Sequence, residues 1–132
     1  MLKNKITTYL GIDWGTSRVG LAMGDSETKI ATPYKVVNDL NEILEIIKQE
    51  KINEIVIGRP VKMSGDTENL TLEYGEFIIS LKNNMHLPVR EIDERLTSKA
   101  ADALFGDKIA KVPRDAVAAM LILQSYLDRP IV

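Results

Sequence analysis

The 132-residue sequence contains no cysteine, one histidine and no long uninterrupted apolar run. Without cysteine the chain can form neither a disulfide framework nor a thiolate metal site. Any metal must therefore be bound by oxygen atoms or by one imidazole, which argues against zinc. No apolar run approaches the roughly 20 residues that span a bilayer, and the N-terminal residues lack the apolar core of a signal peptide. We therefore expect a cytoplasmic protein that does not contact a membrane.

The overall composition is that of an ordinary globular protein, with 45% hydrophobic and 27% charged residues. This length lies near the commonest domain size, so residues 1–132 are expected to form one domain around one core. The formal net charge of −2 does not decide whether the chain binds nucleic acid, because binding depends on where the Lys and Arg residues lie.

The first part of the chain has the pattern of strands followed by a helix. Residues 6–37 contain two apolar runs around a tight turn, which predict a hairpin or meander. Pro33 interrupts a third strand candidate, so that strand is expected to lie at a sheet edge or to end there. Apolar residues then recur at helical spacing over residues 39–50, with Asn38 or Asp39 as the N-cap.

The second part of the chain alternates strands with helices. Residues 52–58 predict a buried strand and residues 87–93 a further strand, separated by a helix over 67–81. A short helix over 98–105 and a longer one over 114–127 follow. This order predicts a mixed α/β sheet, with three antiparallel strands followed by parallel strands and flanked by helices. In such sheets, ligands bind at the carboxyl ends of the strands.

Three carboxylates stand at the boundaries of these elements. Asp13 closes the first strand, Glu94 follows the strand that ends at Asp93, and Asp115 opens the last helix. Only one of Asp93 and Glu94 can face a given site, because neighbouring strand residues point to opposite faces. Each acid also has an ordinary structural interpretation, as a partner of turn amides or as a charge at the positive end of a helix. Taken together, the three positions indicate convergence at one rim of the sheet.

Three converging carboxylates would repel one another unless divalent cations were bound between them. Mg²⁺ or Mn²⁺ suits a ligand set made only of oxygen atoms. Two such ions about 4 Å apart activate a water for attack on phosphorus and stabilise the leaving oxygen, without a Ser, Cys or His nucleophile. These residues therefore predict a metal-dependent enzyme that hydrolyses phosphodiester bonds, with Asp13, Glu94 and Asp115 as its catalytic and metal-binding residues.

Four motifs occur in order along most of the chain. They are GIDWGTSRVGLAMGD, GRPVKMSG, DERLTS followed by AADAL, and DAVAAMLILQSYLD. Together they resemble the YqgF family, described as Holliday junction resolvases and as pre-16S rRNA nucleases, over about residues 9–128. The resemblance implies an RNase H-like fold related to RuvC-type resolvases. It also implies that the acidic site of the family falls on Asp13, Glu94 and Asp115.

The same motifs give further residues a role in binding the substrate. The resemblance implies that Arg18, Arg59, Arg95 and Thr97 contact substrate phosphates or support the acids. Other basic residues in these regions are consistent with a nucleic-acid face, although a solvated surface explains them equally well. They are Lys62, Arg90, Lys99, Lys108, Lys111 and Arg114.

The chain departs from the family pattern in three places. Ser17 stands where a basic residue is common, Trp14 replaces a more usual tyrosine, and the segment 106–114 carries few basic residues. We therefore expect one phosphate contact to be lost and the substrate to be bound more weakly. Trp14 has two interpretations, as a platform on which a base stacks or as a cover for the sheet edge. All three acids remain, so an active enzyme is expected.

Two other functions stay open at this point. The motif DWGTSRVG also resembles the first phosphate-binding turn of actin-like and sugar-kinase ATPases. Those proteins need two such domains, and this sequence offers one, without a second glycine-rich turn. The other candidate is a non-catalytic RNA-binding module for ribosome assembly, which metal-dependent cleavage lost in Asp13→Asn would exclude.

Within nuclease function, the resemblance offers two substrates. One is the 5′ end of the pre-16S rRNA. We expect this substrate because of the function that the family is taken to have. The alternative is a four-way DNA junction, cut by a Holliday junction resolvase. A resolvase must cut two strands symmetrically and should be a stable homodimer, whereas an enzyme that trims RNA can act as a monomer. No residue of the sequence chooses between them.

Overall fold

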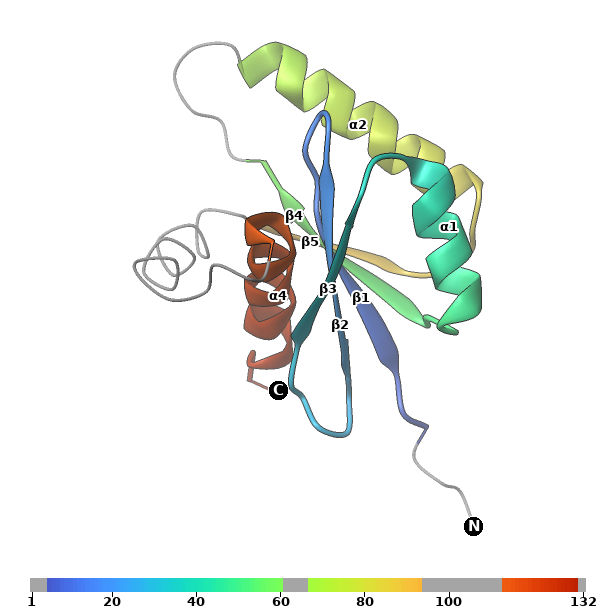
Figure 1. Cartoon of the computed structure of the whole chain (residues 1–132), viewed down its shortest axis with the longest axis vertical. Helices are drawn as coiled ribbons and strands as arrows, with labels where there is room; N and C mark the ends of the chain where they lie inside the picture. The colour runs from blue at the N-terminus through green and yellow to red at the C-terminus, as the bar shows by residue number, and fades with distance from the viewer. Residues whose placement is uncertain (1–4, 61–66, 94–112, 131–132) are drawn as a thin grey trace.

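A computed structural model describes residues 5–60, 67–93 and 113–130 of the chain (Figure 1). These residues form a mixed sheet with helices on both of its faces, which confirms the predicted α/β class. The short helix expected over 98–105 lies outside the described residues. In chain order the elements are β1 (Thr8–Asp13), β2 (Val19–Asp25), β3 (Thr32–Val37), α1 (Leu40–Gln49), β4 (Glu54–Arg59), α2 (Thr67–Asn83), β5 (Val89–Asp93) and α4 (Arg114–Leu127).

The five strands have the order β3-β2-β1-β4-β5. β1 pairs antiparallel with β2, and β2 pairs antiparallel with β3, whereas β1, β4 and β5 are parallel, as the sequence predicts. The strand that contains Pro33 lies at an edge of the sheet, which confirms that expectation. Because β1, β4 and β5 run the same way, their last residues meet at one side of the sheet, which we call the carboxyl edge.

The two faces of the sheet have different coverings. Figure 1 shows α1 and α2 on one side and α4 on the other. Leu10 and Ile12 of β1 belong to the large core cluster with residues of α1 and α2, whereas Tyr9 packs against the smaller cluster that contains Leu123 of α4. Since side chains alternate along a strand, Asp13 belongs to the same face as Tyr9, the face that α4 covers.

Local hydrogen bonds explain where α1 begins. The side chain of Asp39 accepts a hydrogen bond from the amide of Glu42 at 3.0 Å. In return, the carboxylate of Glu42 accepts one from the amide of Asn38 at 2.8 Å. This reciprocal arrangement satisfies amides that have no partner in the first turn of a helix. Of the two predicted N-caps, Asp39 is the one that the structure uses.

Helix α4 lies unusually close to the sheet because glycines face it. A Cβ atom added at Gly20 of β2 would overlap the backbone carbonyl of Asp115, in the first turn of α4. A Cβ atom added at Gly11 of β1 would lie 2.8 Å from the Cβ of Leu123 and 3.0 Å from the carbonyl oxygen of Ala119. The sheet can therefore hold α4 at this distance only where it lacks side chains. Within the described residues, no helix is both long and apolar enough to cross a bilayer.

The close approach of α4 predicts opposite effects for two glycine substitutions. Gly20→Ala should lower the free energy of unfolding by at least about 2 kcal/mol, because the new methyl group meets backbone that cannot rotate away. Gly75→Ala, in the middle of α2, meets nothing within 4 Å and should raise it by up to about 1 kcal/mol through helix propensity. Urea unfolding of both variants measures the difference, and equal stabilities would contradict this account of the packing.

Candidate active site

The structure brings two of the three predicted acids together at the carboxyl edge. Asp13 is the last residue of β1 and is half-buried. Its register partner in β2 is Gly20, against which the backbone of Asp115 packs. Because Asp13 belongs to the face of the sheet that α4 covers, its carboxylate and the first turn of α4 are neighbours. The sequence placed both acids at element boundaries, and the glycine contact explains how they meet.

Arg18 supplies positive charge beside these acids. It lies between β1 and β2, and its Nε is 3.2 Å from Oδ2 of Asp115. The Arg18 side chain is 68% exposed and that of Asp115 is 29% exposed, so water and salt screen the pair. A pair this exposed contributes at most about 1 kcal/mol to folding. The Arg18 side chain can therefore leave Asp115 and bind another anion.

The other residues at the carboxyl edge belong to the opposite face. Arg59 ends β4 and is exposed, and its register partner is Asp93 at the end of β5. Ile57 of β4 packs with the core under α1 and α2, so alternation places Arg59 on that face as well. Glu91 of β5 accepts a hydrogen bond from the Tyr74 hydroxyl of α2 at 2.7 Å, which puts Asp93 on the same side. Neither Arg59 nor Asp93 shares a face with Asp13.

The remaining predicted site residues have different outcomes. Glu94, Arg95 and Thr97 lie outside the described residues. The expectation that Arg90 joins the basic residues near the acids is wrong. Arg90 lies near the start of β5, and its Nε is 3.2 Å from a carboxylate oxygen of Glu54 at the start of β4. Hydrogen bonding and charge from Glu54 raise the pKa of this arginine above its ordinary value.

Trp14 follows Asp13 and packs against α2. Its ring centroid is 5.7 Å from that of Tyr74 and 6.3 Å from that of Phe77. Trp14 also packs against the large core cluster. Of the two interpretations that the sequence left open, this packing favours a structural cover over a platform for a base.

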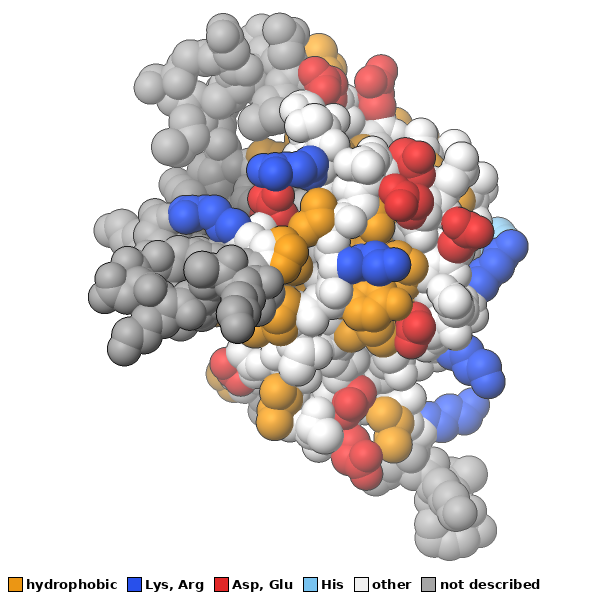
Figure 2. Space-filling view, viewed as in Figure 1, with side chains coloured by type: hydrophobic (Ala, Val, Ile, Leu, Met, Phe, Trp, Pro, Cys, Tyr) orange, Lys and Arg blue, Asp and Glu red, His pale blue; other side chains and the backbone are white. Residues whose placement is uncertain are grey.

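The charge distribution agrees with an anion-binding region at one end of α4. On the face shown in Figure 2, Lys or Arg side chains lie beside an acidic side chain at the upper end of α4, whereas acidic side chains gather over α2 and α1. Binding of nucleic acid depends on such local groups of Lys and Arg rather than on net charge.

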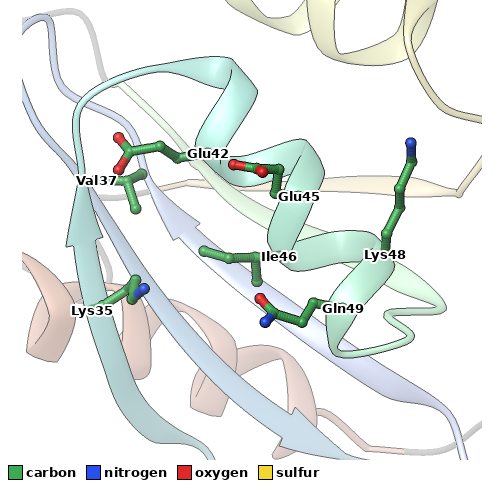
Figure 3. Close-up of a pocket in the computed structure, with 7 residues that line it drawn as sticks. All are labelled: Lys35, Val37, Glu42, Glu45, Ile46, Lys48 and Gln49. Carbon is green, nitrogen blue, oxygen red and sulfur yellow. The ribbon is translucent and has the colours of Figure 1, made fainter.

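The largest described cavity lies elsewhere, between β3 and α1, and has a volume of about 550 Å³ (Figure 3). Figure 3 shows Val37 and Ile46 at its floor, while the Lys48 side chain points away from the sheet. Glu42, one of its two acids, already caps α1. Since α1 covers the face opposite to Asp13, this cavity is separate from the paired acids.

The donor atoms present suit a hard divalent cation but are incomplete within the described residues. No group of three or more His, Cys, Asp or Glu side chains in those residues is arranged to hold a metal. Asp13 and Asp115 offer only carboxylate oxygens, the ligands that Mg²⁺ and Mn²⁺ prefer. The two described acids are thus consistent with part of such a site.

The sequence matches the family model RuvX, described as Holliday junction resolvase, over residues 7–129. A protein of Maridesulfovibrio salexigens is 40% identical over 91% of this chain and 97% of its own length. One of Chloroflexus aggregans is 34% identical over 92% of this chain and 93% of its own. Both carry the name "Putative pre-16S rRNA nuclease".

Two solved structures with this architecture are proteins bound to Holliday junctions. Thermus thermophilus RuvC in complex with a Holliday junction substrate matches with a TM-score of 0.61 at 15% identity, over 92% of this chain and 93% of that chain. The Fowlpox virus resolvase in complex with Holliday junction DNA matches with a TM-score of 0.56 at 13% identity, over 92% and 97%. These matches confirm the predicted RNase H-like fold.

The ion pair of Arg18 with Asp115 predicts how Arg18 would affect the binding of a divalent cation at these acids. A cation bound at Asp115 has to displace Arg18, so Arg18→Gln should tighten Mn²⁺ binding by up to about fivefold, the equivalent of an exposed ion pair. Asp115→Asn should weaken Mn²⁺ binding instead. Isothermal titration without nucleic acid measures both, with Lys48→Gln on α1 as the charge-matched control. Weaker Mn²⁺ binding by Arg18→Gln would show that Arg18 does not compete.

Proposed function

Because this chain belongs to the RuvX family, as its match over residues 7–129 shows, we propose that it cleaves the 5′ end of pre-16S rRNA at its carboxyl edge. It is a nuclease, a hydrolase that acts on phosphodiester bonds. Relatives that are 34% and 40% identical over most of the chain carry the name of such an rRNA nuclease, which supports the choice of RNA.

One observation carries the placement of the active site. The backbone of Asp115 packs on Gly20, and Gly20 is the register partner of Asp13. Two acids that are 102 positions apart in the sequence are thus held together by strand pairing and helix packing. Rigid elements of this kind position catalytic groups more precisely than loops do.

We assign the metal-binding role to Asp13, Asp115 and Glu94. Asp93, the acid before Glu94, belongs to the face covered by α2, which supports Glu94 as the third carboxylate. Mg²⁺ or Mn²⁺ bound there would lower the pKa of a coordinated water and stabilise negative charge on the leaving oxygen. The chain itself contributes the fixed positions of the carboxylates, which α4 and β1 set.

Arg18 is proposed as a phosphate-binding residue of the same site. Its guanidinium lies beside Asp115 and is mostly exposed, so it can turn to a phosphate once a cation neutralises that carboxylate. Arg95 and Thr97 remain proposals from the family motif. Arg59 is also a proposal from the family motif. Because it belongs to the other face of the sheet, it would contact a different part of the substrate.

A four-way DNA junction is the second candidate substrate. The name of the family and the two resolvases with matching structures favour it. Symmetric cutting of a junction requires two active sites, so this function predicts a stable homodimer. The oligomeric state in solution therefore tests this candidate independently of any cleavage assay, because a stable monomer would contradict it.

The central prediction concerns Asp13→Asn. This change keeps the size of the side chain but removes a proposed metal ligand. Cleavage should therefore fall by more than about a hundredfold, a larger loss than that caused by changing a residue that only orients a metal ligand. Asp39→Asn is the matched control, because asparagine also caps helices well and Asp39 begins α1, which covers the opposite face of the sheet from α4. Both variants should unfold at nearly the temperature of the unmodified chain.

The assay uses a structured precursor rRNA 5′ end and a four-way DNA junction side by side, with Mg²⁺ or Mn²⁺. Cleavage of RNA alone, lost in Asp13→Asn and kept in Asp39→Asn, would support both the site and the rRNA substrate. Symmetric cleavage of the junction alone would assign the resolvase function instead. Metal-dependent cleavage that survives Asp13→Asn would overturn the proposed site, and no cleavage of either would favour an RNA-binding module.

A further inference from the structure

A second cavity lies at the opposite end of β1 and α4 from the paired acids. It has a volume of about 360 Å³. We call it the tyrosine pocket, and the residues that line it are Tyr9, Ser26, Lys29, Tyr126, Leu127 and Arg129. Tyr9 belongs to the same face of β1 as Asp13, and Tyr126 lies in the last turn of the helix that Asp115 opens.

Aromatic rings and a guanidinium group form one wall of the tyrosine pocket. The rings of Tyr9 and Tyr126 meet edge to face, with centroids 5.8 Å apart. The guanidinium of Arg129 lies over the Tyr126 ring, 3.8 Å from its centroid. The Tyr126 hydroxyl donates a hydrogen bond to Glu54 at 2.9 Å, which fixes the ring. Planar guanidinium and aromatic groups are the surfaces on which unpaired bases stack.

The cations of the tyrosine pocket are available to a ligand. Within the part of the chain that the structure describes, neither Lys29 nor Arg129 forms an ion pair. Of two nearby acids, Glu54 is paired with Arg90 at 3.2 Å, while a carboxylate oxygen of Asp128 accepts a hydrogen bond from the neutral Gln124 amide at 3.0 Å. Asp128 therefore keeps its negative charge, which offsets one of the two cations of the pocket.

Hydrogen bonds hold Lys29 in place before any ligand arrives. Its backbone is left-handed, with φ of 55°, a conformation that costs a non-glycine residue energy. The side-chain amide of Gln124 on α4 donates to the Lys29 carbonyl at 2.9 Å and accepts from the Ala31 amide at 2.8 Å. This clamp ties the β2–β3 connection to the helix that carries Tyr126 and Arg129. A site fixed in advance binds its ligand with less loss of entropy.

From this geometry we infer that the tyrosine pocket binds one unpaired nucleotide of a nucleic-acid strand, with its base stacked on the Arg129 guanidinium that lies over Tyr126 and its phosphate at Lys29. The inference rests on the proposed nuclease function for its choice of nucleic acid as the ligand. Tyr9 and Asp13 are four residues apart on one strand, or about 13 Å. Asp115 and Tyr126 are eleven residues apart on one helix, or about 16 Å. Since α4 covers β1 between these residues, a strand would have to run along α4, where 16 Å corresponds to about five stacked nucleotides.

Two lysines of this chain provide a matched pair of test variants. Lys29 and Lys51 are the two described non-glycine residues with positive φ, at 55° and 54°, and both are exposed. Lys51 follows α1, on the far side of the sheet from α4. Lys29→Gly and Lys51→Gly each remove one charge and relieve the same backbone strain, so both should raise the thermal midpoint of unfolding. Only Lys29→Gly removes a ligand contact.

The experiment measures binding of a fluorescent single-stranded RNA in EDTA, where metal-dependent cleavage cannot occur. Lys29→Gly should reduce the slope of log affinity against log salt by about 0.7, the value for one phosphate contact to a single strand. Lys29→Gly combined with Arg129→Ala should also weaken binding by roughly tenfold at fixed salt, within the range for one lost base stack. Lys51→Gly should leave slope and affinity unchanged.

The outcomes separate the pocket from the active site. Equal effects of Lys29→Gly and Lys51→Gly, or no effect of the double variant, would overturn the tyrosine pocket. If the variants behave as expected but the unmodified chain cleaves neither RNA nor DNA, the pocket stands and the proposed nuclease substrate fails. If cleavage is lost in Asp13→Asn while the variants at Lys29 and Arg129 leave binding in EDTA unchanged, the active site stands and the pocket fails.

Discussion

The packing of α4 on a sheet face without side chains determines the rest of the site. Gly20 and Gly11 let the helix backbone approach β2 and β1 to a distance that any Cβ atom would prevent. That distance, together with the pairing of Asp13 with Gly20, brings the first turn of α4 to the end of β1. A helix held a few ångströms further out would leave gaps in the apolar packing and would also separate the two carboxylates. The glycines therefore serve both the packing of α4 and the geometry of the acids.

Collecting acids at one edge has an electrostatic cost, which the ion pair of Arg18 with Asp115 offsets in part. Arg18 pairs with Asp115 in a mostly exposed position, where screening makes the interaction weak. Like charges held together by rigid elements lower stability unless a cation joins them. The free energy gained by burying the apolar core, which includes Leu10, Ile12 and Leu81, offsets this cost. At the proposed site, a cation would compete at Asp115 with this weak ion pair.

The sequence predicts elements and faces well because both follow from local periodicity. The bounds of α4, the edge position of the strand with Pro33 and the parallel strands all agree with the structure. Arg90 could not be placed correctly, because its partner Glu54 is 36 positions away and becomes a neighbour only through strand pairing. Arg59 was grouped with the acids by its motif, although alternation along β4 turns it to the other face. The tyrosine pocket had no local signal at all, since Tyr9, Lys29 and Tyr126 meet only after the sheet and α4 have packed.

The same two elements connect the acids with the tyrosine pocket, and this constrains how a substrate can lie. Asp13 and Tyr9 occupy one face of β1, while Asp115 and Tyr126 occupy the two ends of α4. Neither β1 nor α4 can shift along its axis without breaking the glycine contacts at Gly20 and Gly11, so the spacing between the two sites is set by the fold. A nuclease that measured its cut from a held nucleotide would need such a fixed spacing. Sequence changes that preserve the glycines would preserve that spacing, even where the residues that contact the substrate differ.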